Sequence, residues 1–150
     1  MTEAPTIGAP PRIRILIADD HVTVREGLAA IIGRQTDMVV VAEAATGADA
    51  IARWRDHRPD VTLMDLRMPG LDGVGAMMGI CAVDASARIV VLTTFDSDHD
   101  MSRAMTAGAK GYLLKDAGRE DLLDCIRSVH AGRTCLPPAA PPTPTADTQP

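Results

Sequence analysis

Residues 61–73 read VTLMDLRMPGLDG, and this stretch decides the fold. An apolar run with two β-branched residues ends abruptly at Asp65, and the turn-forming pair Pro69-Gly70 follows. A short apolar run bounded by turn residues is typical of a strand buried on both faces, and Pro69 prevents its continuation as a helix. We therefore expect Asp65 at the carboxyl end of a central strand, the edge at which open α/β sheets bind ligands. A carboxylate at such a place either caps the following helix or takes part in chemistry.

The rest of the chain alternates short apolar runs with amphipathic segments. The apolar runs predict further strands at residues 12–18, 38–44, 88–93 and 111–114. Apolar residues at helical spacing predict helices at residues 22–33, 74–83, 97–107 and 120–130, and one more helix that Thr46 caps and that ends before Pro59. Strand followed by helix, five times over, predicts a single α/β domain in which helices cover both faces of a parallel sheet.

Two glycines weaken one of these predicted helices. Gly75 and Gly79 lie within residues 74–83, and each costs about 1 kcal/mol relative to alanine inside a helix. We therefore expect this helix to be weakly specified and mobile.

The two ends of the chain differ in composition from its middle. Residues 1–11 contain three prolines and little apolar content, which predicts a flexible arm. Residues 135–150 are dominated by proline and small residues, which predicts an extended linker or tail. The folded domain is thus expected to span residues 12–134.

The composition excludes several classes of protein. A net charge of −5 argues against broad nucleic-acid binding, which requires a basic face to neutralise phosphates. No apolar stretch approaches the length of a membrane span, so no membrane association is expected. The three cysteines show no metal-ligand spacing and no signal peptide is visible, which indicates reduced thiols in a cytoplasmic protein. Only three residues are aromatic, so the core is expected to be aliphatic.

Polar side chains follow the predicted strands where their carboxyl ends share one edge of the sheet: Asp19, Asp20, Asp65, Thr93 and Lys115. Three carboxylates brought together repel one another unless a cation binds between them. Oxygen ligands suit Mg²⁺ or Mn²⁺, and the lack of nearby cysteine or histidine ligands disfavours Zn²⁺; the adjacent His21 is interpreted as a surface or capping residue. The lysine and the threonine supply the charge and the hydroxyl donor that a phosphoryl group requires. This set predicts phosphoryl transfer to a carboxylate nucleophile.

Four motifs together resemble the receiver domain of bacterial two-component response regulators: IADDH at 17–21, MDLRMPGLDG at 64–73, VLTTF at 91–95 and GAKGYLLKD at 108–116. The resemblance covers residues 12–136, and IADDH and GYLLKD are most similar to the NarL/FixJ-type (LuxR-like) class of transcriptional regulators. It implies a flavodoxin-like fold, a (βα)5 doubly wound domain whose five parallel strands lie in the order 2-1-3-4-5.

The resemblance also implies roles for individual residues. Asp65 would be the phosphoacceptor. Asp20, Asp65 and the backbone carbonyl of Arg67 would bind Mg²⁺ directly, and Asp19 would bind it through water. Lys115 would pair with the phosphoryl oxygens, and Thr93 would donate its hydroxyl to them. Tyr112 matches the switch aromatic that turns inward when this threonine moves; the alternative is an edge aromatic that packs on a helix.

Three further positions give more specific expectations. Arg67 and Phe95 lie two residues beyond the acceptor and the threonine, where they would flank the phosphoryl group and restrict attacking water; alternatively, both point to solvent or a partner. Asp116 follows the lysine where many receivers have proline, often after a cis peptide bond, so the geometry of this bond stays open.

The resemblance names the partners as well. A sensor histidine kinase would donate the phosphoryl group, homodimerisation would follow, and DNA would be bound only through an output domain that this chain lacks. A stand-alone receiver and a pseudo-receiver that no longer accepts phosphate remain alternatives. An aspartate-nucleophile phosphatase of the haloacid-dehalogenase type is disfavoured because it needs an acid two residues after the nucleophile, where this chain has Arg67.

Overall fold

The computed structural model describes residues 12–94 and 98–136 and contains a five-stranded parallel sheet in the order β2-β1-β3-β4-β5. The elements are β1 (Ile13–Ala18), α1 (Val22–Gly33), β2 (Met38–Ala44), α2 (Gly47–His57), β3 (Val61–Asp65), α3 (Gly73–Val83), β4 (Ile89–Thr93), α4 (Asp98–Thr106), β5 (Gly111–Leu114) and α5 (Arg119–His130). The predicted strand order and flavodoxin-like architecture are confirmed, and the predicted elements differ from these bounds by one or two residues at most.

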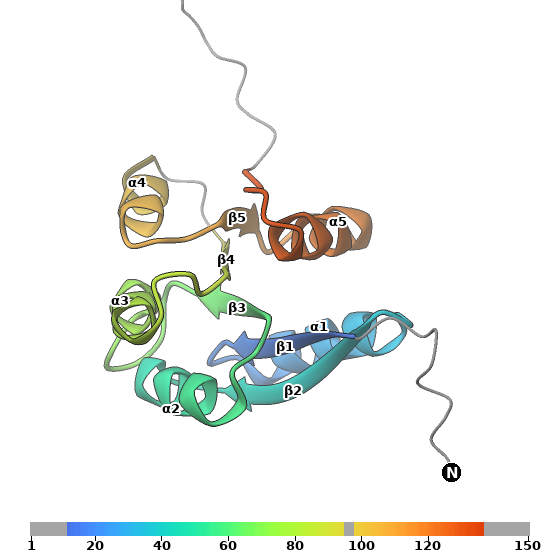
Figure 1. Cartoon of the computed structure of the whole chain (residues 1–150), viewed down its shortest axis with the longest axis horizontal. Helices are drawn as coiled ribbons and strands as arrows, with labels where there is room; N and C mark the ends of the chain where they lie inside the picture. Colours follow the sequence, from blue (N-terminus) through green and yellow to red (C-terminus); the bar gives the residue numbers. More distant parts are fainter. Residues whose placement is uncertain (1–11, 95–97, 137–150) are drawn as a thin grey trace, which may run out of the picture.

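The helices form two layers, with α2, α3 and α4 on one face of the sheet and α1 and α5 on the other (Figure 1). Because successive strand residues point to opposite faces, Leu63 packs into the α1/α5 layer and its neighbour Met64 into the α2/α3/α4 layer. Both strand residues are almost completely buried. As predicted, the core is built mainly from aliphatic side chains, with Trp54 and Tyr112 as its buried aromatic residues among those described.

The glycines of α3 allow close packing rather than simply weakening the helix. A methyl group added at Gly79 would lie 2.6 Å from Cδ1 of Ile51 on α2, and one at Gly75 would lie 2.5 Å from Cδ1 of Leu71. Asp72 caps the helix, since its Oδ1 accepts a hydrogen bond from the Gly75 N–H at 2.9 Å. The Asp72 cap and the close contacts at the two glycines therefore support this helix despite its weak intrinsic propensity, and its predicted mobility stays a prediction.

The segment after α5 lies along the open edge of β5. The Tyr112 N–H donates to the Cys135 carbonyl at 2.8 Å, and the Cys135 N–H donates to the Lys110 carbonyl at 2.9 Å. Cys135, predicted to begin the linker, is thus held by backbone hydrogen bonds to the sheet edge. Its neighbour in the core, Cys125, is a buried free thiol.

The predicted arm at residues 1–11, the residues after 136 and Phe95 lie outside the described residues. No described helix is both long and apolar enough to cross a lipid bilayer.

Candidate functional site

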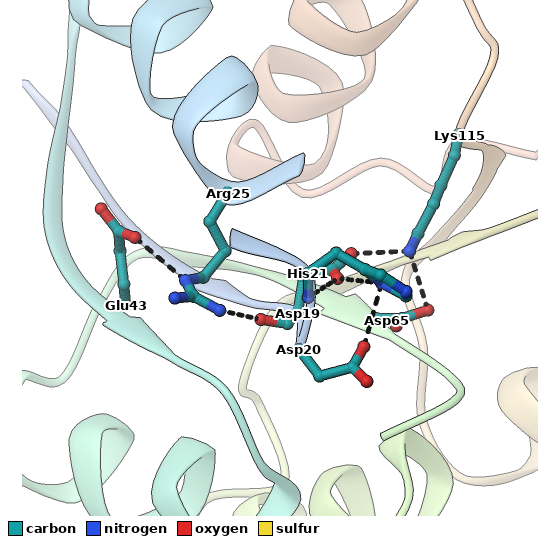
Figure 2. A network of polar contacts seen from close by, with 7 residues as sticks. All are labelled: Asp19, Asp20, His21, Arg25, Glu43, Asp65 and Lys115. Carbon is teal, nitrogen blue, oxygen red and sulfur yellow. Dashed lines mark hydrogen bonds and ion pairs between the residues drawn. The ribbon is translucent and has the colours of Figure 1, made fainter. Parts of the chain in front are cut away.

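Asp19 lies in the loop between β1 and α1 and is held from several sides. Its backbone N–H donates to the Ala44 carbonyl at 3.0 Å, which extends the pairing of β1 with β2 by one residue. Its carboxylate is almost completely buried; Oδ1 accepts the His21 N–H at 2.8 Å, and Oδ2 lies 2.7 Å from Lys115 Nζ. Figure 2 shows Asp19 between this lysine and the start of α1.

Asp65 ends β3 beside the same lysine. Its Oδ1 lies 3.3 Å from Lys115 Nζ, and the side chain is 4% exposed. The backbone folds tightly here because the Gly73 N–H donates to the Leu66 carbonyl at 2.9 Å, and a side chain at Gly73 would collide with the Asp65 carbonyl. The glycine that ends the motif MDLRMPGLDG is therefore needed to close the loop around the acid.

The titration of Asp65 and Lys115 reflects their shared environment. Burial, followed by the negative charge of Asp19, raises the pKa of Asp65 above its ordinary value, although Lys115 and a backbone hydrogen bond from Arg67 act in the opposite direction. Burial is the largest single influence on Lys115 and favours its neutral form, but the hydrogen bond to Asp19 and the charges of Asp65 and Asp19 together raise its pKa. The lysine therefore stays protonated, and the acids repel each other.

The acidic group fits a hard divalent cation. Asp19, Asp20, His21 and Asp65 each offer a ligand atom, and these atoms lie within 4.8 Å of one another. Asp65 Oδ2 is buried and forms no hydrogen bond with any described residue, which is energetically costly unless a cation binds there. The set is dominated by carboxylate oxygens, the ligands that Mg²⁺ and Mn²⁺ prefer. Asp19, Asp20 and Asp65 would hold the ion.

His21 is exposed, in agreement with its interpretation as a surface residue, but its ring also contacts the acids. It occupies the position before α1, but its side chain makes no capping hydrogen bond to the helix. Instead, Nδ1 lies 3.1 Å from Asp19 Oδ1 and 3.1 Å from Asp20 Oδ1, while the side chain remains 63% exposed.

Two interactions beside the acids were not apparent from the sequence. Arg25 of α1 contacts the Asp19 carbonyl and Glu43 of β2, and Arg67 forms an ion pair with Asp100 of α4. The partners lie 18 residues apart for Arg25 and Glu43 and 33 residues apart for Arg67 and Asp100, so no local spacing signals them.

Thr93 and Tyr112 occupy neighbouring strands at this end of the sheet. Thr93 ends β4 and is buried, and its carbonyl accepts the Lys115 N–H at 2.7 Å, which joins the two strand ends directly. Tyr112 is fully buried in the layer that contains Ala104 of α4. A buried ring suits both a switch residue and a packing residue, so its role in switching stays a prediction. The Lys115–Asp116 peptide is trans, since the described residues contain no cis peptide bond.

The Arg67 side chain is directed to α4. Nη2 lies 2.9 Å from Asp100 Oδ2, and Asp100 is nearly buried while the arginine is 65% exposed. Arg103 lies 4.0 Å from Asp100 and 3.6 Å from Asp72, which extends the network to the loop before α3. The arginine proposed to flank a phosphoryl group is therefore paired with a carboxylate in this structure.

Comparison with known proteins places this geometry in a family. Residues 15–127 match the response regulator receiver domain. The chain is 45% identical over 121 residues to the transcriptional regulatory protein YxjL of Bacillus subtilis and 44% identical over 123 residues to the oxygen regulatory protein NreC of Staphylococcus aureus. Each alignment covers 81% of this chain but only 56% and 57% of those proteins, so the chain spans little more than half their length.

Solved structures agree with the sequence comparisons. A two-component response regulator of the LuxR family from Aurantimonas superposes with a TM-score of 0.82 at 37% identity, covering 85% of this chain and 91% of that one. The signal receiver domain of the putative response regulator NarL from Mycobacterium tuberculosis gives 0.73 at 34% identity, covering 79% and 98%. The resemblance to NarL- and LuxR-type regulators inferred from the motifs is confirmed, and the chain belongs to the response regulator receiver domain family.

Proposed function

We propose that this receiver accepts a phosphoryl group on Asp65 from the phosphohistidine of a sensor histidine kinase, with Mg²⁺ or Mn²⁺ bound by Asp19, Asp20, Asp65 and the Arg67 carbonyl. The observation that carries the proposal is the Asp65 carboxylate: Oδ1 lies 3.3 Å from the Lys115 ammonium, and Oδ2 is buried without a hydrogen bond to a described residue. A nucleophile and a fixed positive charge at one strand end are what in-line phosphoryl transfer requires.

The transfer exchanges one bond for another. A carboxylate oxygen of Asp65 attacks phosphorus, the P–O bond forms as the P–N bond of the phosphohistidine breaks, and the departing imidazole nitrogen takes the electron pair and a proton from water. The divalent cation supplies positive charge that reduces the repulsion between carboxylate and phosphoryl oxygens. Lys115 pairs with the new charge and Thr93 donates its hydroxyl to it. The domain promotes only its own phosphorylation and dephosphorylation and is not otherwise an enzyme.

Phosphorylation would change the surface that the receiver presents to partners. In this proposal, the contact of Thr93 with the phosphoryl group is reported through Tyr112, and the surface around α4 and β5 shifts between two states. Arg67 and Phe95 would restrict the access of water to the phosphoryl group. Homodimerisation is the expected response, in a protein expected to lie in the cytoplasm.

Incubation with phosphoramidate or acetyl phosphate and Mg²⁺, followed by intact-mass measurement, tests the phosphoacceptor. The wild-type chain should gain the mass of one phosphoryl group, and Asp65→Asn should gain none. If the wild-type chain gains no mass with either donor, the chain is a pseudo-receiver that acts as a protein-interaction module.

The output is proposed from the relatives. YxjL is described as a transcriptional regulatory protein, and this chain spans 56% of its length, so we infer that the receiver controls a DNA-binding output domain. Sequencing the gene beyond the codon for Pro150 tests this part. A reading frame that continues into a DNA-binding domain supports it, and a stop codon favours a stand-alone receiver.

A further inference from the structure

Arg25 joins three elements next to the acidic group. Its Nη1 donates to the Asp19 carbonyl at 2.6 Å, and its Nε donates to Glu43 Oε1 at 3.2 Å (Figure 2). The arginine belongs to α1, the glutamate to β2 and the aspartate to the loop after β1. The Arg25 side chain is only 16% exposed, so it packs against the protein rather than extending into solvent.

The contact fixes the peptide plane between Asp19 and Asp20. The N–H of Asp19 already donates a hydrogen bond to the Ala44 carbonyl at 3.0 Å. The hydrogen bond from Arg25 to the Asp19 carbonyl therefore fixes the second backbone polar group of this residue. The orientation of this peptide plane determines the direction in which the Asp20 side chain leaves the backbone. The Asp20 side chain is 28% exposed, and among described residues only His21 lies within ion-pair distance of its carboxylate. Its position therefore depends on the backbone that Arg25 holds.

Glu43 neutralises the charge of Arg25, so the arginine can orient the loop without adding positive charge next to the cation site. A guanidinium with no counter-ion beside three carboxylates would repel a divalent cation and weaken its binding. Because Glu43 pairs with the same guanidinium, the pair orients the loop and contributes little net field to the cation site.

We propose that Arg25 is a positioning residue that, together with Glu43, sets the affinity of the acidic group for its divalent cation by orienting Asp20. The inference rests on the proposed function, because it concerns the same cation site. It assigns a role in that site to two residues that touch neither the cation nor the phosphoryl group.

Charge and geometry make opposite predictions for this pair. If Arg25 acted only through its charge, Arg25→Met would strengthen cation binding because a repelling charge is lost. If it positions the loop, the same substitution weakens binding. The double variant Arg25→Met with Glu43→Gln removes both charges, leaves the net charge unchanged and isolates the geometric effect.

The experiment is isothermal titration of the complete chain with MgCl2. For the double variant we expect a Kd about tenfold weaker than that of the wild-type chain, the lower end of the range for removing residues that orient metal ligands. The control is Arg127→Met with Asp37→Asn, which removes another ion pair without changing the net charge. That pair, with Nε 2.9 Å from Oδ2, joins α5 to the loop before β2. The control should bind Mg²⁺ like the wild-type chain.

Arg25→Lys keeps the test valid if the double variant does not fold. The lysine retains the positive charge, but its compact ammonium cannot contact Glu43 and the Asp19 carbonyl at once as the planar guanidinium does. The Mg²⁺ affinity of this variant should therefore also fall. Its melting temperature without cation should stay close to that of the wild-type chain. A folded double variant that binds Mg²⁺ as tightly as the control, or an Arg25→Lys variant with unchanged affinity, overturns the inference alone. A wild-type chain that binds no Mg²⁺ overturns the proposed function as well.

Discussion

Lys115 lies nearer to Asp19 than to the proposed phosphoacceptor, with Nζ 2.7 Å from Asp19 Oδ2 and 3.3 Å from Asp65 Oδ1. The lysine is 14% exposed, and both carboxylates are almost completely buried. In this structure the ammonium therefore acts as the counter-ion of two acids at once. Removing one partner from a buried ion pair leaves the remaining charge uncompensated, which costs far more than the pair itself contributes.

We expect Lys115→Met to lower the free energy of unfolding by about 3 kcal/mol at pH 7 without divalent cations. Mg²⁺ should restore part of this stability, because a bound cation takes over the charge that the lysine supplied. Urea unfolding with and without MgCl2 measures both effects. Lys110→Met, at the other end of β5, serves as the control and should show no added response to Mg²⁺. An equal loss of stability with and without Mg²⁺ in Lys115→Met would contradict the expectation.

Asp65→Asn should stabilise the fold at neutral pH in the absence of divalent cations. The pKa of Asp65 is raised by burial and by Asp19, so the folded state holds this proton to higher pH than the unfolded state does. The protein therefore loses stability as the pH rises from 3.8, the ordinary pKa of an aspartate, through the raised folded-state pKa of Asp65. Above that range the ionised carboxylate destabilises the folded state. The melting temperature of the variant should exceed that of the wild-type chain at pH 7, and the difference should shrink towards pH 4. A variant that is less stable than wild type at pH 7 refutes this.

The pair formed by Arg127 and Asp37 predicts the opposite dependence on pH. Nε and Nη2 of Arg127 lie 2.9 and 3.1 Å from the two carboxylate oxygens, and this hydrogen-bonded contact lowers the pKa of Asp37. The stabilisation is present above the unfolded-state value of 3.8 and disappears as the pH falls through the lowered folded-state pKa.

Because both side chains are more than a third exposed, Arg127→Met should cost only about 0.5–1 kcal/mol at pH 7. Urea unfolding should show this cost at pH 7 and a smaller one below the lowered folded-state pKa of Asp37. A cost that is independent of pH would assign the effect to lost packing of the arginine rather than to its charge.

The convergence of four polar residues was predictable because each lies at or just after the end of a strand, and parallel strands bring their carboxyl ends to one edge: Asp19, Asp20, Asp65 and Lys115. The contacts of Arg25 and Arg67 were not predictable. They depend on the rotation of α1 and α4 about their axes and on the conformation of a long side chain. Neither quantity is encoded in the spacing of apolar residues.

Two further features show where sequence patterns mislead. Helix propensity takes no account of neighbouring elements, so it marks Gly79 only as a destabilising residue. In the structure the side chain of Ile51 on α2 lies where a side chain at Gly79 would begin. The proline-rich composition after Cys135 indicates a linker, yet the open edge of β5 offers hydrogen-bonding groups that the chain uses before the prolines begin. In both cases a partner distant in sequence determines the structure.

Gly73→Ala should disturb the loop that follows Asp65, whereas Gly27→Ala should not. A methyl group at Gly73 would lie 2.8 Å from Leu66 Cα and closer still to the Asp65 carbonyl, and neither backbone atom can move away easily. We expect a loss of about 2 kcal/mol in the free energy of unfolding, together with slower phosphorylation by phosphoramidate. Gly27, inside α1, has open space around its Cα, so alanine there should stabilise by about 0.5–1 kcal/mol. Equal effects of the two substitutions would contradict the close approach at Gly73.

Asp100 should control how long Asp65 stays phosphorylated, because it competes for Arg67. The guanidinium is 2.9 Å from Asp100 and only two residues from the acceptor, so a phosphoryl group on Asp65 and the Asp100 carboxylate attract the same charge. Asp100→Asn weakens one competitor, frees Arg67 to shield the phosphoryl group from water and should lengthen the half-life of the phosphorylated chain. Arg67→Ala should shorten it.

The double variant decides whether the two residues act together. If Asp100 acts through Arg67, adding Asp100→Asn to Arg67→Ala changes nothing further, and both variants lose the phosphoryl group at the same rate after the donor is removed. Intact-mass measurement over time gives each half-life. If Asp100→Asn lengthens the half-life equally in the presence and absence of Arg67, Asp100 acts by another route, such as the position of α4. If Arg67→Ala leaves the half-life unchanged, the guanidinium of Arg67 does not shield the phosphoryl group from water.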